Sequence, residues 1–120
     1  MSRMNVMDAV VGVMEDEGVE VAFGVPGAAI LPLYKALSKS EQIKHYSVRH
    51  EEGGTHAADG YTRVTGKVGI NIGTSGPAGT NMITGLYTCM ADSIKQICIT
   101  GQAPTRCCTK RPSRRWTSWR

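Results

Sequence analysis

The chain has 120 residues, of which 41% are hydrophobic, 20% charged and 6% aromatic, a composition that excludes disordered and fibrous proteins. Its length allows one hydrophobic core, because a domain ordinarily needs about 100–200 residues. No apolar run reaches the length of a membrane span, about 20 residues, and acidic residues interrupt the amino end where a secretory signal would be apolar. We therefore expect a cytoplasmic protein with one compact domain.

The formal net charge of +4 comes from the carboxyl end of the chain. Residues 106–120 hold six of the 14 basic residues and no acid, which leaves 8 basic and 10 acidic residues in residues 1–105. Both tryptophans also lie in this last segment. Residues 1–105 are therefore mildly acidic, and the basic charge is confined to a tail that looks foreign to them. Cys89 and Cys98, which lie outside the tail, are expected to be reduced thiols rather than a disulfide or metal pair.

Hydrophobic periodicity predicts helices alternating with strands. Apolar residues at three- and four-residue steps from Met4 to Met14 predict a helix over 3–17 that ends in a left-handed cap at Gly18. The other predicted elements are strand 19–25, helix 28–37, strand 43–48, helix 51–65, strand 68–72, a helix entered from the loop 73–81, and strand 94–100. Small residues within 51–65 indicate a helix packed unusually close to a neighbour. The order predicts a doubly wound α/β fold, a parallel sheet with helices on both faces.

Ligands of such sheets bind in loops at the carboxyl ends of the strands, here around residues 24–28, 49–53, 73–81 and 101–104. The glycine-rich segment Gly73–Gly79 is compatible with a phosphate-binding loop or with a tight structural turn. His50 and His56 are either zinc ligands or polar residues of a helix surface. Ser75 lacks the flanking pattern of a hydrolase nucleophile. Glu51 begins a helix directly after a strand, as a partner of the helix dipole or as a functional carboxylate.

Six short segments, taken together, favour a functional role for Glu51. They are 22–27 (AFGVPG), 49–53 (RHEEG), 58–61 (ADGY), 73–77 (GTSGP), 91–94 (ADSI) and 99–102 (ITGQ). In this order they resemble the amino-terminal pyrimidine-binding domain of thiamine diphosphate enzymes, over residues 4–105. Within that family the chain is similar to the branch of glyoxylate carboligases and acetolactate synthases.

The resemblance implies a catalytic role for Glu51, which would hydrogen-bond N1′ of the cofactor's aminopyrimidine. The positions that match the cofactor pocket are Val25, Pro26, Glu51, Thr74, Gly76, Pro77 and Asn81, and Gln102 matches a position near the reacting centre. The implied reaction is decarboxylation and ligation of 2-oxo acids, from glyoxylate to tartronate semialdehyde or from pyruvate to acetolactate. Glu51 matches acetolactate synthases, because glyoxylate carboligase is known for a valine there. We expect partial desolvation to help this carboxyl keep its proton.

The resemblance also implies that this chain supplies half of an active site. In the family, a separate domain holds the diphosphate and Mg²⁺ through a Gly-Asp-Gly and Asn-Asn signature that this sequence lacks. That domain comes from another subunit of a homo-oligomer, and the full-length family can also carry FAD. We therefore expect the chain alone to bind the pyrimidine end at most and to be inactive. The pair Lys95-Gln96 departs from the family pattern and is expected to bring a charge to the entrance of a buried strand.

Residues 106–120 do not continue the resemblance. With one base inserted near codon 106, permitted codons for this segment read Val-Leu-His-Lys-Glu-Ala-Phe-Gln-Ala-Val-Asp-Ile-Val-Glu, the continuation that the family predicts. The expected organisation is a partial pyrimidine-binding domain at 1–105 and a non-native, frameshifted tail at 106–120. The alternative is a non-catalytic regulatory or nucleic-acid-binding module that uses the basic tail.

Overall fold

The computed structural model describes residues 4–103, and the tail at 106–120 lies outside them. Four parallel strands form one sheet in the order β2-β1-β3-β4. Their bounds are β1 Val21–Gly24, β2 Lys44–Ser47, β3 Gly69–Gly73 and β4 Gln96–Thr100. The chain therefore starts near the middle of the sheet, adds β2 on one side of β1, and then crosses to β3 on the other side.

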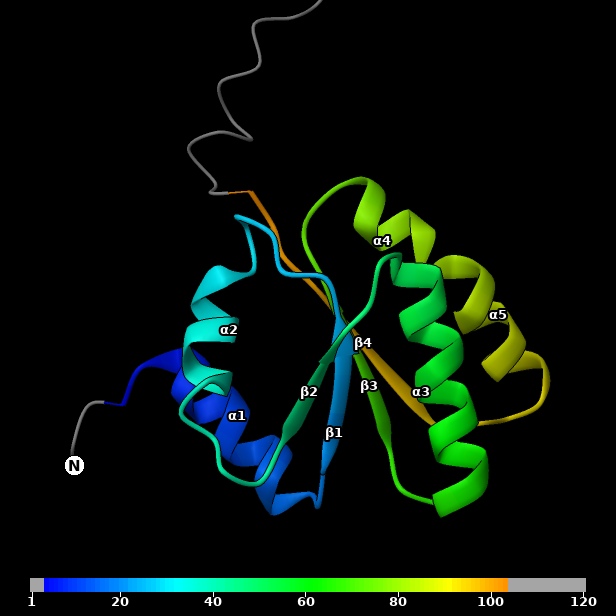
Figure 1. Cartoon of the computed structure of the whole chain (residues 1–120), viewed down its shortest axis with the longest axis horizontal. Coiled ribbons are helices and arrows are strands. Elements are labelled where there is room, and N and C mark those ends of the chain that lie inside the picture. Colours follow the sequence, from blue (N-terminus) through cyan, green and yellow to red (C-terminus); the bar gives the residue numbers. More distant parts are fainter. Residues whose placement is uncertain (1–3, 104–120) are drawn as a thin grey trace, which may run out of the picture.

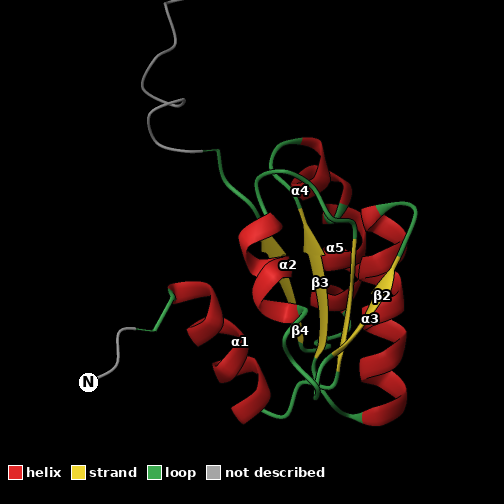
Figure 2. Cartoon of the chain, turned by 60° about the vertical axis from the view of Figure 1, so that its left-hand side comes forward, coloured by secondary structure: helices red, strands yellow, loops and turns green. Residues whose placement is uncertain are grey.

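Helices cover both faces of this sheet, which confirms the predicted doubly wound α/β fold. The helices are α1 Val6–Asp16, α2 Leu31–Leu37, α3 Glu51–Thr65, α4 Pro77–Asn81 and α5 Ile83–Ala91. Figures 1 and 2 show α1 and α2 on one face and α3 with α5 on the other, while α4 lies at the end where the strands terminate. Within residues 4–103, no helix is long and apolar enough to cross a membrane.

The two faces of the sheet are packed with different kinds of side chain. The α1 and α2 face is an apolar core that includes Leu33 with Ile70 and Ile72 of β3. Side chains alternate along a strand, so Asn71 lies between these isoleucines and turns to the α3 face. The buried polar side chains gather on the α3 face; they are Thr55, Asp59, Thr62 and Asn71. This face is therefore organised by hydrogen bonds as well as by apolar contact.

The predicted close approach of helix 51–65 is confirmed. A Cβ atom on Gly69 of β3 would lie 2.3 Å from the backbone oxygen of Ala58. A Cβ atom on Gly54 would lie 2.3 Å from Oδ1 of Asn71. Glycine is required at position 69 because the helix and strand backbones nearly touch there, whereas the atoms nearest to Gly54 belong to the side chains of Asn71 and Val48. Gly18 also fulfils its predicted role, with φ of 76° directly after Glu17, the C-cap residue of α1.

Several element boundaries and exposures differ from the sequence predictions. Helix α2 begins at Leu31 rather than at residue 28 because the preceding residues form a turn, in which the amide of Ile30 donates to the carbonyl of Gly27 at 3.0 Å. Residues 77–81, predicted as part of the loop, form the short helix α4, and α5 follows after Met82. Met4 is exposed rather than part of the apolar face. Lys95 is exposed as well, so its charge does not enter a buried strand.

Candidate functional site at the carboxyl ends of the strands

The loops that carry the predicted site converge between β1 and β3, where the strand order reverses. The amide of Val25 donates to the carbonyl of Ile72 at 3.0 Å, and the amide of Gly101 donates to that of Gly73 at 3.0 Å. The loop after β1 also reaches the loop after β3, because the amide of Ala29 donates to Oγ1 of Thr74 at 3.4 Å. Such a switch point is where open α/β sheets bind ligands.

Glycines allow these loops to approach one another closely. A Cβ atom on Gly27 would lie 2.6 Å from Cβ of Thr74, and one on Gly101 would lie 2.7 Å from the backbone of Ala29. At the end of β3, a Cβ atom on Gly73 would lie 2.4 Å from Cε of Met82 and 3.4 Å from Cγ of Glu51. The absence of a side chain at Gly73 thus makes room for Met82, and Glu51 lies at ordinary contact distance from this position.

Glu51 is the first residue of α3, and its position is set by the start of that helix. His50 is the N-cap residue, with extended backbone angles, and its Nδ1 atom accepts a hydrogen bond from the amide of Glu52 at 3.3 Å. The half-buried Glu51 side chain accepts a hydrogen bond at Oε2 from Nδ2 of Asn81, at 2.9 Å. The structure therefore brings together two predicted site residues that are separated by 30 positions.

The ionisation of Glu51 differs from the sequence expectation. The hydrogen bond from the Asn81 amide lowers the pKa of this carboxyl, and this effect outweighs desolvation, which acts in the opposite direction. A hydrogen bond donated to a carboxylate favours its charged form. The prediction that desolvation keeps Glu51 protonated is therefore wrong for this structure, and Glu51 acts as a hydrogen-bond acceptor at neutral pH.

The other predicted site residues lie on the same edge with different exposure. Val25 and Thr74 are half-buried, and Pro26, Gly76, Pro77 and Gln102 are exposed. Gln102 is brought to this edge by the bond between its neighbour Gly101 and Gly73. Asn71 was not among the predicted site residues, and its side chain donates a hydrogen bond to the backbone carbonyl of Glu51. Its signal was a polar residue in the middle of an otherwise apolar strand.

The alternative chemistries have no assembled site among residues 4–103. No group of three His, Cys, Asp or Glu side chains in this part of the chain could hold a metal ion. His50 and His56 each lie 3.9 Å from a carboxylate oxygen of Glu52. Cys89 is buried and Cys98 half-buried, both as free thiols, and burial raises the pKa of each to about 11. Both thiols are therefore protonated at neutral pH and poor nucleophiles.

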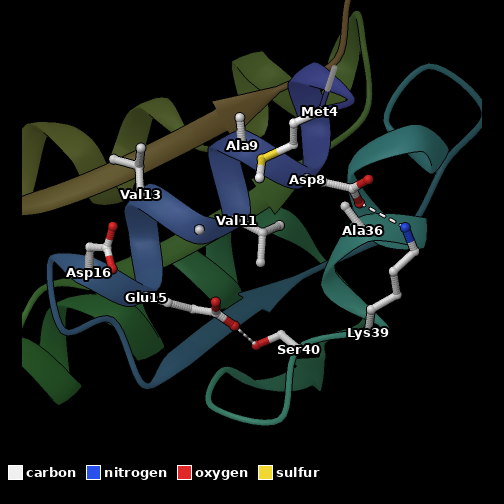
Figure 3. Close-up of a pocket in the computed structure, with 11 residues that line it drawn as sticks. Met4, Asp8, Ala9, Val11, Val13, Glu15, Asp16, Ala36, Lys39 and Ser40 are labelled. Carbon is white, nitrogen blue, oxygen red and sulfur yellow. Dashed lines mark hydrogen bonds and ion pairs between the residues drawn. The ribbon is translucent and has the colours of Figure 1, made fainter. Parts of the chain in front are cut away.

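A groove of about 680 Å³ lies along α1 and α2, on the apolar-core side of the sheet (Figure 3). It contains none of the predicted site residues. Four of its polar side chains form two pairs: Nζ of Lys39 lies 2.8 Å from Oδ1 of Asp8, and the hydroxyl of Ser40 donates to Glu15. The groove therefore does not compete with the strand edge as the candidate site.

The family of the chain follows from comparison with known proteins. Residues 4–116 match the family described as thiamine pyrophosphate enzyme, N-terminal TPP binding domain, and the chain belongs to this family. It is 57% identical over 105 residues to a glyoxylate carboligase of Escherichia coli O157:H7. It is 50% identical over 103 residues to a probable acetolactate synthase large subunit of Methanococcus aeolicus, and 52% identical over 99 residues to an acetolactate synthase large subunit of Parasynechococcus marenigrum.

These three matches cover 87%, 86% and 80% of this chain but only 18%, 17% and 16% of the respective relatives. The chain thus spans about a sixth of the length of the proteins it resembles. The comparisons confirm the predicted branch of thiamine diphosphate enzymes, in which both carboligase and acetolactate synthase names occur.

Proposed function

We propose that this chain forms the pyrimidine-binding half of the active site of a thiamine diphosphate-dependent carboligase. The observation that carries the proposal is the Glu51 carboxylate at the carboxyl end of β3, held by the Asn81 amide at 2.9 Å. A negatively charged hydrogen-bond acceptor, Glu51, lies at the same edge as the half-buried side chains of Val25 and Thr74. This combination fits a heteroaromatic ring with a basic nitrogen. Glu51 would accept a hydrogen bond from N1′ and hold a proton on that atom.

The remaining site residues would orient the ring. Val25, Pro26 and Pro77 offer apolar contact to its faces, while Thr74 and Gly76 border it from the loop after β3. Asn81 would hold Glu51 as well as line the pocket, and Gln102 would face the reacting centre from the loop after β4. When bound, thiamine diphosphate supplies the electron sink for decarboxylation of a 2-oxo acid. The proposed substrates are glyoxylate or pyruvate.

In the whole protein, we propose that a second subunit of a homo-oligomer holds the diphosphate with Mg²⁺, in the cytoplasm. This division follows the family resemblance, and the free thiols Cys89 and Cys98 are typical of a reducing compartment. FAD would belong to that larger assembly. The chain alone would then lack catalytic activity. No observation on residues 4–103 favours the alternative of a regulatory or nucleic-acid-binding module.

The proposal can be tested on the 120-residue chain with the aminopyrimidine half of thiamine, 4-amino-5-hydroxymethyl-2-methylpyrimidine. We expect chemical-shift changes at Val25, Glu51 and Thr74, with a dissociation constant of about 1 mM, as suits a ligand of this size. Glu51→Gln should weaken binding at least about tenfold, because a hydrogen bond to a charged group is lost. Glu52→Gln is the matched control and should bind as the parent chain does. Shifts confined to the groove between α1 and α2 would contradict the proposal.

A further inference from the structure

Asn71 is a polar side chain in the middle of a fully buried strand. All five residues of β3 are buried, and Asn71 has 0% exposure. Its strand neighbours Ile70 and Ile72 belong to the apolar core on the opposite face. An amide at such a position is costly unless its hydrogen bonds are made inside the protein. The contacts of Asn71 therefore indicate what the residue is there to do.

The side-chain nitrogen of Asn71 is bonded to the first turn of α3. It donates to the backbone carbonyl of Glu51 at 2.8 Å and to Oγ1 of Thr55 at 2.8 Å. The hydroxyl of Thr55 in turn donates to the same Glu51 carbonyl at 2.9 Å. Both hydrogens of the amide are thus used, and two side chains hold the Glu51 backbone from β3 and from within α3. Gln96 of β4 adds a bond from its Nε2 to the carbonyl of Thr55, at 2.9 Å.

The side-chain oxygen of Asn71 has no hydrogen-bond partner and is buried. It lies against Gly54, where a Cβ atom would be 2.3 Å away. Turning the amide over would place this oxygen against the Glu51 carbonyl, which cannot donate, so the observed orientation is the one that the surroundings allow. An apolar residue of similar size would leave no unpaired oxygen. The unpaired oxygen costs free energy, and the bonds of the amide nitrogen to Glu51 and Thr55 offset that cost.

We infer that Asn71 is a positioning residue of the proposed cofactor site. It holds the backbone of Glu51 from β3 so that the Glu51 carboxylate stays in contact with Asn81. The inference rests on the proposed function for its significance. Asn71 lies beneath α3, reaches Glu51 only through the backbone carbonyl, and is therefore not a catalytic residue. Its effect must be measured on the geometry of Glu51 itself, in an experiment that needs no cofactor.

The test is a pH titration of the 120-residue chain by nuclear magnetic resonance, following the carboxyl carbon of Glu51 and the side-chain amide of Asn81. In the parent chain the two signals should titrate together. In Asn71→Leu, we expect the pKa of Glu51 to rise and the titration of the Asn81 amide to be lost, because the carboxylate leaves its partner. Amide hydrogen exchange in the first turn of α3 should become about tenfold faster.

Thr62→Val is the matched control for general loosening of the α3 face. The Thr62 hydroxyl accepts from the amide of Gly69 and donates to the carbonyl of Ala58, both at 2.9 Å, so its loss weakens the same helix–strand contact. This variant should leave the titration of Glu51 unchanged. Unchanged titration in a folded Asn71→Leu, or an equal change in Thr62→Val, would overturn the inference.

A second variant tests the inference without removing Asn71. Gly54→Ala would place a methyl group against Oδ1 of Asn71 and displace the amide, while alanine favours the helix. We expect the Glu51 titration to shift in the same direction as in Asn71→Leu. If Asn71→Leu does not fold, the Glu51 titration in Gly54→Ala becomes the test. An unchanged titration in Gly54→Ala overturns the inference. Neither readout depends on whether the aminopyrimidine binds, so failure of the proposed function is recognised separately.

Discussion

The hydroxyl of Tyr34 and the ring of His45 form a polar contact between α2 and β2. Oη of Tyr34 lies 3.1 Å from Nε2 of His45, and the rings meet edge to face. Burial raises the pKa of Tyr34 to about 12, so the phenol keeps its proton at neutral pH. It can then donate to Nε2 only while the imidazole is neutral. Burial also lowers the pKa of His45 below its ordinary value of 6.5.

This contact predicts a loss of stability on mild acidification. Between the lowered pKa of His45 and 6.5, the unfolded chain binds more protons than the folded chain, so the free energy of unfolding rises with pH. Stability should therefore fall as the pH drops from 7.5 to 5.5. Urea denaturation of the 120-residue chain across this range measures the effect. His45→Gln should flatten the dependence, and the exposed His56→Gln should not. An equal slope in the parent chain and His45→Gln would assign the effect to other groups.

At the scale of elements, the contact between α3 and β3 depends on the absence of side chains at particular positions. A Cβ atom on Gly69 would meet the carbonyl oxygen, carbonyl carbon and Cα of Ala58, all backbone atoms, at 2.3–2.9 Å. Backbone cannot move aside as a flexible side chain can. Gly60 lies in α3, as Ala58 does, yet a Cβ atom on Gly60 would have nothing within 4 Å. A side chain therefore has no space at position 69 and open space at position 60.

Alanine substitutions at these two positions should have opposite effects on stability. Gly69→Ala forces α3 away from β3, and we expect it to destabilise the chain by about 2–3 kcal/mol, as overpacking does in other cores. Gly60→Ala should stabilise it by about 0.5–1 kcal/mol, because glycine in a helix interior costs backbone entropy. Thermal and urea denaturation of both variants measure the difference. A neutral Gly69→Ala would show that the helix and strand separate without cost.

The sequence predicted the elements better than their contacts, for physical reasons. Helix 51–65 was predicted with its observed bounds from the small residues between Glu51 and Thr65, and in the structure Gly66 ends it in a left-handed conformation. The turn before Leu31 was missed because alanines at 28 and 29 also suit a helix. The bonds that orient Glu51 come from Asn71 and Asn81, residues 20 and 30 positions away. No local pattern encodes such pairings, and so the direction of the Glu51 pKa was wrong.

At the scale of the whole molecule, the chain matches about a sixth of each relative's length, yet that sixth contains a complete switch point. Glu51 comes from the connection between β2 and β3, Thr74 and Asn81 come from the connection between β3 and β4, and all three lie at one edge of a four-stranded sheet. The hydrogen bonds that hold Glu51 in place are made within residues 4–103. We therefore expect residues 4–103 to support cofactor activation when they replace the matching segment of a relative.

The last prediction uses such a replacement. Residues 4–103, placed in the acetolactate synthase relative of Methanococcus aeolicus, which is 50% identical over the match, should support exchange of the C2 proton of bound thiamine diphosphate. Glu51→Gln in this chimera should slow that exchange by about 10²–10⁴, the range of general acid–base contributions, since an amide cannot hold a proton on N1′ as a carboxylate does.

Glu52→Gln controls for the loss of a charge at the same helix terminus, and it should stay within a few-fold of the parent rate. Glu52 pairs with His50 and His56 rather than with Asn81, so its removal leaves the Glu51 contact in place. Hydrogen–deuterium exchange at C2, followed with glyoxylate and with pyruvate turnover in parallel, separates cofactor activation from substrate preference. Exchange that is unchanged in Glu51→Gln would reduce Glu51 to a partner of the α3 dipole and place activation elsewhere.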